Sequence, residues 1–455
     1  MNQIGSRGKF ADDGDEKFLC DKIWSKSECR QWTIMLFLGT CTLYASRVAL
    51  PICATALSHE YLWNKSDSGT VLSCFFWGYA FTQLFAGTIA DTVGGERVLR
   101  TTTFVWTFFT FFTPQLFDFS MKTSHPLFFV LVVRIATGIG QGFHLPCMAS
   151  ITSRHLTSTE KGRIFGICLA GSHLGTAVAG AVGSILLDIF GWRTLFHFVG
   201  LISFIWWLIF RHMTSSLTRG MQEKNLDAAK LTETPLLLTR QTSLAKVVIP
   251  EKTEPVDWKK LLTHSAFWAA AVAQYSGANA YYTLFSWLPS YFADNFPSAK
   301  GVVFNVVPSL AIVVTSFTAP FLASKLCSRL RSMTIARRIM EGTSLASISV
   351  CLFLLTWTDR FLPALMIITL AMAARGLHHG GASVNACDFA PQHTGSVFGV
   401  FNTFSSVTGF IGVYIAGYIL HKTSNNWSLV FIFTALQCVV GALVYSVLGT
   451  ATRII

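Results

Sequence analysis

The sequence predicts an all-α membrane protein of about twelve transmembrane helices, arranged as two halves of six. Three observations support this prediction. Of the 455 residues, 52% are hydrophobic and only 13% are charged, whereas about 25% are charged in a typical soluble domain. The apolar residues form about twelve runs, most of them near the roughly 20 residues that cross a bilayer. Lysine and arginine gather in alternate loops between those runs.

A polar stretch divides the apolar runs into two groups. It contains Thr, Lys, Glu and Pro without apolar periodicity, which is typical of a flexible linker. We therefore expect an N-terminal segment at 1–32, six-helix halves at 33–212 and 263–449, a linker at 213–262 and a short tail at 450–455. The runs lie at 33–57, 69–90, 98–119, 127–150, 164–187 and 195–210, then at 266–292, 302–326, 339–357, 363–385, 396–420 and 428–448.

The distribution of basic residues predicts the orientation of the chain. Cytoplasmic loops carry an excess of Lys and Arg, so both termini are expected in the cytoplasm. The acceptor sequons at Asn64 and Asn426 then fall in loops on the opposite side. The first 31 residues lack the apolar core of a cleavable signal peptide. The basic loops carry Arg97 and Arg100, then Arg154, Lys161 and Arg163, then the linker, and then Lys325, Arg329, Arg331, Arg337 and Arg338.

Other classes of protein are disfavoured by what the residues lack. The net charge of +12 comes from loops on one side of the membrane, which indicates orientation rather than binding to nucleic acid. The eleven cysteines lack the spacing of a metal site. The sequence shows no nucleophile paired with a base and no phosphate-binding Gly-Lys loop, so we expect no enzyme, no metal and no cofactor. A receptor or channel stays open as an alternative, although the six-plus-six layout argues against a receptor.

Two arginines inside predicted spans indicate the cargo. Arg47 lies in the first span and Arg134 in the fourth, where a central arginine costs about 2.5–3.5 kcal/mol to insert. The carboxylates Asp91, Asp118, Asp188, Glu341 and Asp388 all lie near predicted span ends. An anionic substrate is therefore the expected partner, since guanidinium groups suit carboxylate and phosphate. Pairing with backbone carbonyls and trapped water is the alternative. Arg375 in the tenth span is a third case of the same kind.

The turn after the second span resembles the loop motif of the major facilitator superfamily. It contains Gly87, Asp91, Gly95 and Arg97, and we expect these residues to latch one conformation through close helix packing and a carboxylate contact. The family's usual arginine after the aspartate is Thr92 here, which weakens the proposed latch.

Four further segments resemble solute carrier family 17, the vesicular and organic-anion transporters of that superfamily. The resemblance implies two pseudo-symmetric halves with a substrate site at the midplane between them, lined by the first, fourth, seventh and tenth spans. It implies that Tyr44, Arg47, Arg134, His378 and Asn385 contact substrate. The segments are Tyr44-Ala-Ser-Arg47, Ser73 to Gln83, Arg134 to Pro146, and Asn385 to Pro391. In the third segment, Pro146 predicts a helix kink.

Within that family the sequence is most similar to a nucleotide-carrying branch, through residues 50–53, 63–65 and 296–308. This resemblance implies alternating-access uptake of ATP and other nucleotides into secretory or lysosome-related vesicles, driven by membrane potential and modulated by chloride. Transport of glutamate, sialate or phosphate remains the alternative.

Position 141 bears on the driving force. Relatives that move glutamate or sialate have a glutamate seven residues after the fourth-span arginine, where this chain has Gln141. A glutamine leaves the cavity positive and offers no carboxylate for proton coupling, which favours potential-driven entry of an anion. In the linker, Glu233, Leu237 and Leu238 resemble an acidic dileucine signal for vesicle adaptors.

Overall fold

The computed structural model describes residues 24–156, 158–232, 256–391 and 393–455. The N-terminal half (N-half) contains α2 (Lys26–Glu60), α3 (Lys65–Val93), α4 (Gly95–Ser120), α5 (Pro126–Gly142), α6 (His144–His155), α7 (Ser158–Phe190) and α8 (Trp192–Thr232). The C-terminal half (C-half) contains α9 (Trp258–Thr263), α10 (Ser265–Asn295), α11 (Gly301–Leu330), α12 (Met333–Leu355), α13 (Phe361–Gly376), η1 (Leu377–Gly380), η2 (Ala382–Val384), α14 (Asn385–Phe389), α15 (Thr394–Lys422) and α16 (Trp427–Leu448).

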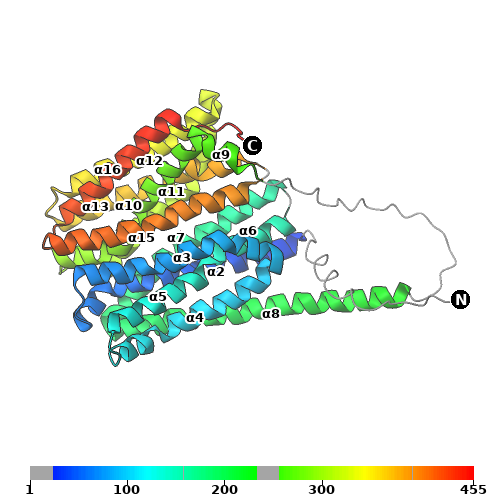
Figure 1. Cartoon of the computed structure of the whole chain (residues 1–455), viewed down its shortest axis with the longest axis horizontal. Coiled ribbons are helices and arrows are strands. Elements are labelled where there is room, and N and C mark those ends of the chain that lie inside the picture. Colours follow the sequence, from blue (N-terminus) through cyan, green and yellow to red (C-terminus); the bar gives the residue numbers. More distant parts are fainter. Residues whose placement is uncertain (1–23, 157, 233–255, 392) are drawn as a thin grey trace.

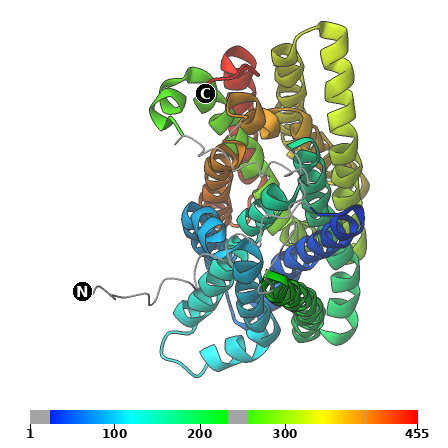
Figure 2. The same cartoon turned by 90° about the vertical axis from the view of Figure 1, so that its right-hand side faces the viewer.

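The long helices form one elongated bundle with the C-half above the N-half (Figure 1). Figure 2 looks along the helices and shows the same division. Within the described residues, nine segments are long and apolar enough to cross a membrane. Together with α3, α4 and α10 they make twelve long helices, so the predicted fold class is confirmed.

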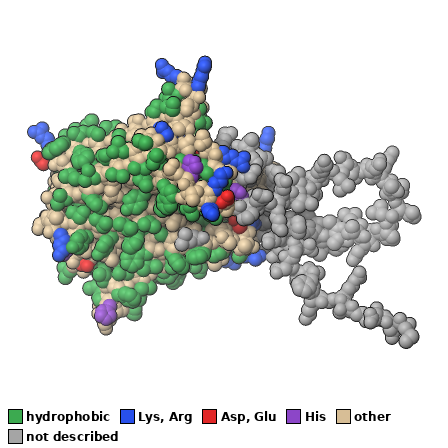
Figure 3. Space-filling model, turned by 45° about the horizontal axis from the view of Figure 1, so that its top comes forward, with side chains coloured by type: hydrophobic (Ala, Val, Ile, Leu, Met, Phe, Trp, Pro, Cys, Tyr) green, Lys and Arg blue, Asp and Glu red, His purple; other side chains and the backbone are tan. Residues whose placement is uncertain are grey.

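The outer surface of the bundle is apolar. Phe81, Phe128, Phe321 and Leu443 are each more than 60% exposed, and Figure 3 shows apolar side chains over the middle of one face with charged side chains toward its ends. Soluble proteins rarely expose continuous apolar surface of this extent. The surface is that of a protein embedded in lipid.

Two of the spans are interrupted. The fourth breaks at Phe143, between α5 and α6, as expected from Pro146, which has no N–H to donate to the carbonyl of Gly142. Gln83 Nε2 of α3 donates to that carbonyl instead, at 2.6 Å. The tenth span, expected as one run over 363–385, ends as an α-helix at Gly376 and continues as two short 3-10 turns.

The polar stretch after Arg211 is helical for its first part. α8 continues as far as Thr232, beyond the expected end of the sixth span at residue 210. The predicted dileucine signal at Glu233, Leu237 and Leu238 lies outside the described residues.

The two halves meet along three pairs of helices, α3 with α15, α7 with α11, and α2 with α10. Glycines allow close approach at one of these contacts: a Cβ added at Gly69 of α3 would lie 3.0 Å from the Cα of Gly417 of α15. Near this point Lys65 Nζ lies 2.6 Å from Asp294 Oδ2, and Asn305 Nδ2 donates to Ser184 Oγ at 2.9 Å. We call this the Lys65 end of the bundle, which is the side predicted to face away from the cytoplasm.

Candidate functional site

Arg47 is buried inside the N-half, within a cage of aromatic rings. Tyr44 precedes it by three residues on α2, so both side chains lie on one face of that helix. The guanidinium carbon lies 4.5 Å from the ring centre of Tyr44, 5.0 Å from that of Phe75 and 4.6 Å from that of Tyr79. Aromatic faces attract cations, most strongly where water is excluded. The predicted grouping of Tyr44 with Arg47 is therefore present in the structure.

The polar contacts of Arg47 leave most of its hydrogen-bonding capacity unused. Its Nε donates to Gln141 Oε1 at 3.4 Å, and Gln141 Nε2 in turn donates to Ser46 Oγ at 3.1 Å. Nη1 and Nη2 are buried without a hydrogen bond of normal geometry, and the hydroxyls of Tyr44 and Tyr79 are the polar groups beside the guanidinium. Buried polar atoms normally have partners, so two donor groups of a permanent cation are left available to a ligand.

Arg134 lies against the same aromatic cluster, at Phe75. Its guanidinium carbon is 5.3 Å from the ring centre of Phe75, and its Nε is buried without a partner. Two glycines bring α5 this close to α3: a Cβ at Gly78 would lie 2.2 Å from Ile135 O, and one at Gly138 would lie 2.1 Å from Phe75 O. The Phe75 ring is thus shared by two guanidinium groups from different helices.

No carboxylate within the described residues forms an ion pair with Arg47 or Arg134. Two like charges around one ring are unfavourable in a medium of low dielectric constant unless an anion joins them. The arrangement can therefore hold an anion through charge-assisted hydrogen bonds. Phe75 and Tyr79 are candidate site residues that the sequence prediction missed, because both rings contact Arg47. Their spacing of four residues in an apolar span, facing an arginine on the preceding span, is the signal for them.

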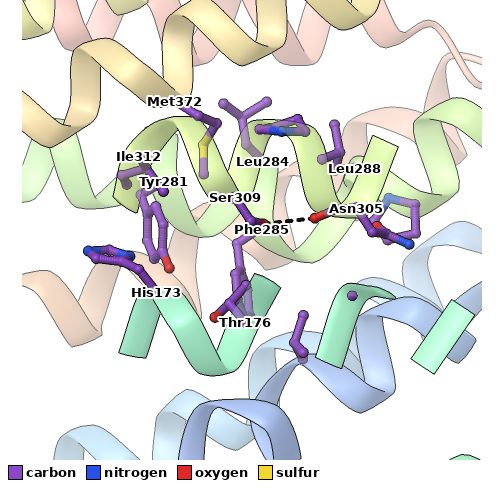
Figure 4. Close-up of a pocket in the computed structure, with 14 residues that line it drawn as sticks. His173, Thr176, Tyr281, Leu284, Phe285, Leu288, Asn305, Ser309, Ile312 and Met372 are labelled. Carbon is purple, nitrogen blue, oxygen red and sulfur yellow. Dashed lines mark hydrogen bonds between the residues drawn. The ribbon is translucent and has the colours of Figure 1, made fainter. Parts of the chain in front are cut away.

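A small pocket lies close to this site, between the halves (Figure 4). Val48, next to Arg47 in the chain, lines it from α2, His173 and Thr176 line it from α7, and Tyr281 lines it from α10. Tyr282 also reaches across the interface, where its ring centre lies 4.7 Å from that of Phe76. Side chains from both halves therefore surround this pocket, in the region where the substrate site is expected.

The C-half contains a buried carboxylate, Glu341, which lies near the start of the predicted ninth span. Glu341 is 0% exposed. It accepts hydrogen bonds from His378 Nδ1 at 2.8 Å and from the backbone N–H of Ala382 at 3.0 Å. The chain buries Glu341 because η1 and η2 fold over α12 after the break at Gly376. His378, predicted to meet substrate, is held by this carboxylate.

Asn385, also predicted to meet substrate, is held by protein partners within the C-half. Its Oδ1 accepts from the Tyr445 hydroxyl, and its Nδ2 donates to Thr450 O at 2.8 Å. Arg337 and Asp388 form an ion pair close by, at 3.2 Å. The structure brings Tyr44, Arg47, Arg134 and Gln141 together, and it does not bring Asn385 to them.

The predicted latch residues lie where α3 turns into α4. Asp91 Oδ1 accepts from Ser150 Oγ of α6 at 2.6 Å, and its backbone carbonyl accepts from Arg154. A Cβ at Gly95 would lie 2.9 Å from Cys147 O, so this glycine permits α4 to pack against α6. Gly87 has open space around it, and Arg97 is exposed in the first turn of α4.

Comparison with known proteins identifies the family. The model of the Major Facilitator Superfamily matches residues 35–413. The "Voltage-gated purine nucleotide uniporter SLC17A9" of Homo sapiens is 36% identical over 436 residues, which are 95% of this chain and 95% of the relative. The chain belongs to solute carrier family 17 of the major facilitator superfamily. This membership confirms the resemblance found in the sequence and makes the protein a membrane transporter.

Two further matches of this family 17 transporter have lower sequence identity. The "Sodium-dependent phosphate transport protein 1, chloroplastic" of Arabidopsis thaliana is 27% identical, with 95% of this chain and 81% of the relative covered. The crystal structure of a bacterial homologue of the human lysosomal transporter Spinster, in an inward-facing, unoccupied conformation, matches with a TM-score of 0.68 at 15% identity and covers 93% of this chain and 97% of the other. That likeness concerns the fold alone.

Proposed function

We propose that this family 17 transporter takes up ATP and other nucleotides by alternating access, driven by the membrane potential. The observation that carries the proposal is the pair of buried arginines around Phe75, which share a ring without any ion-paired carboxylate in the described residues. The 36% sequence identity between this chain and the human nucleotide uniporter supports a nucleotide as the substrate.

Gln141 supports the choice of driving force. It contacts Arg47 as a neutral amide, so the N-half site keeps both positive charges and offers no carboxylate to carry a proton. One elementary charge gains about 2.3 kcal/mol per 100 mV. An anion of roughly three to four charges therefore gains about 7–9 kcal/mol on entering a positive compartment at that potential.

The cellular setting follows from the family resemblance. We place the transporter in secretory or lysosome-related vesicles, with both termini in the cytoplasm and with chloride as a modulator. Vesicle adaptors are proposed to read the dileucine signal at Glu233, Leu237 and Leu238. These proposals rest on the sequence and on the family resemblance. The dileucine signal itself lies outside the described residues.

The test of substrate is uptake into proteoliposomes that carry an imposed inside-positive potential. We expect ATP to be taken up faster than glutamate, sialate or phosphate, with saturation at rising concentration. Glutamate uptake exceeding ATP uptake would contradict the nucleotide assignment, and fast, unsaturable flux would indicate a channel.

The test of the site is Arg134→Ala in the same assay. We expect the variant to insert and to lose uptake, because the anion loses one of its two charged contacts. Arg329→Ala is the matched control, since Arg329 is exposed at the end of α11, and it is expected to transport normally. Normal transport by Arg134→Ala would leave the site without support.

A further inference from the structure

A third guanidinium lies in the C-half without a complete set of partners. Arg375 is in the last turn of α13, and its Nη1 is buried with no hydrogen-bond partner. The guanidinium lies against α10, since a Cβ at Gly277 would be in ordinary contact with its central carbon, at 3.5 Å. Glu341 is within electrostatic range of Arg375, but its carboxylate is engaged by His378 and Ala382.

Two tyrosines connect this arginine to the N-half site. Tyr281 and Tyr282 are adjacent on α10, with ring centres 5.4 Å apart. Tyr281 follows Gly277 by four residues, so it lies on the face of α10 that contacts the Arg375 guanidinium, and the ring centre of Tyr282 lies 4.7 Å from that of Phe76 in the N-half. Tyr281 also lines the pocket between the halves (Figure 4).

Two histidines at the interface add polar groups beside Arg375. His173 of α7 and His379 of η1 belong to opposite halves, and their Nε2 atoms are 3.5 Å apart. His379 follows Arg375 by four residues in the chain, and the ring centre of His173 lies 6.3 Å from that of Tyr281. His173 Nδ1 is buried without a partner. The interface near Arg375 therefore contains an unsatisfied polar atom of the N-half, in addition to Nη1 of Arg375 itself.

We propose that Arg375 is a second anion-binding pole in the C-half, in addition to the pole formed by Arg47 and Arg134 in the N-half. The ligand that fits two separated poles is an elongated polyanion whose charges lie on different groups, such as the polyphosphate chain of a nucleoside diphosphate or triphosphate. A compact monovalent anion satisfies one pole only. This inference deepens the proposed function and rests on it for the nucleoside part of the ligand. Bridging the poles joins the two halves around the substrate, as alternating access requires.

The test uses inorganic phosphates, which carry no nucleoside. Purified transporter in detergent is titrated with orthophosphate, pyrophosphate and tripolyphosphate, and the affinity of each is taken from the rise in melting temperature. We expect tripolyphosphate to bind about 10- to 100-fold more tightly than orthophosphate, as one additional charged hydrogen-bonded contact provides.

Arg375→Gln tests the second pole directly. We expect the tripolyphosphate affinity of this variant to fall to within about threefold of its orthophosphate affinity, while orthophosphate binding at the first pole is unchanged. Arg360→Gln is the matched control, since Arg360 is exposed at the start of the same helix, and it should behave as wild type. Arg375→Lys keeps the charge and should retain part of the preference for the longer chain.

Three results would contradict the proposal that Arg375 is a second anion-binding pole. They are equal tripolyphosphate affinity in Arg375→Gln and wild type, equal affinity of the wild type for all three phosphates, and a melting temperature of unliganded Arg375→Gln several degrees below wild type. The last result would show that the protein itself satisfies Arg375. Absence of ATP uptake by a wild type that still prefers tripolyphosphate would contradict the proposed function and leave the second pole standing.

Discussion

Gln141 joins Arg47 to Ser46: its Oε1 accepts from Arg47 Nε at 3.4 Å, and its Nε2 donates to Ser46 Oγ at 3.1 Å. A neutral side chain thus orients the guanidinium without cancelling its charge. Gln141→Glu would place a carboxylate at this contact and neutralise one of the two positive charges of the site. We expect ATP uptake at pH 7 to fall about tenfold or more, a change of roughly 1.4 kcal/mol. Uptake should recover as acid pH protonates the glutamate.

Gln141→Met is the control for this prediction, because it removes the hydrogen bonds without adding a charge. Its uptake is expected to be reduced equally at all pH values. A Gln141→Glu variant that transports ATP at the wild-type rate across the pH range would argue against a role for site charge.

A second prediction concerns the close contact of α3 with α5. A Cβ at Gly138 would lie 2.1 Å from Phe75 O, so Gly138→Ala must push the two helices apart and move the ring that both arginines share. Overpacking of this kind costs about 1–3 kcal/mol. We expect a lower melting temperature and weaker ATP uptake. Gly166→Ala is the control, since nothing lies within 4 Å of a Cβ there, and it should melt at or above the wild-type temperature. An unchanged melting temperature in Gly138→Ala would contradict the packing described.

A third prediction concerns the ion pair between Lys65 and Asp294. It joins α3 to α10 across the halves at 2.6 Å, with both side chains 23% exposed. Partly exposed ion pairs stabilise a contact by up to about 1 kcal/mol. Lys65→Met should therefore raise the fraction of molecules whose halves are separated at the Lys65 end about fivefold.

The opening is measured by the rate at which a membrane-impermeant maleimide labels Ser184→Cys, in a protein whose other reactive cysteines are replaced. Ser184 contacts Asn305 across the halves, so labelling requires their separation. The double variant Lys65→Asp/Asp294→Lys exchanges the two charges and should label at the rate of the protein with the original ion pair. Equal labelling with and without Lys65→Met would show that the ion pair does not hold this end closed.

Local sequence signals predicted part of the fold and of the site. The break between α5 and α6 follows from Pro146, and the pairing of Tyr44 with Arg47 follows from their spacing on one helix. The break after Gly376 has no proline to mark it; only Gly380 and Gly381 follow. Sequence position put Glu341 near a span end, but burial depends on the chain that folds over it.

The rest of the site depends on the register between helices. Phe75 reaches both arginines only because Gly78 and Gly138 let α3 and α5 approach closely. Hydropathy along one helix carries no information about that register. The same reason explains why Arg375 could be recognised as a buried cation from sequence, but not as a neighbour of Tyr281 and Tyr282.

We propose that a positive N-half site, whose arginines pair with no carboxylate among the described residues, admits a polyvalent anion under a membrane potential. The most direct measurement is the initial rate of ATP uptake into proteoliposomes as the potential and the pH gradient are imposed separately. We predict a rate that rises steeply with inside-positive potential and does not respond to the pH gradient alone. Uptake driven by the pH gradient at zero potential, with no response to potential, would contradict it.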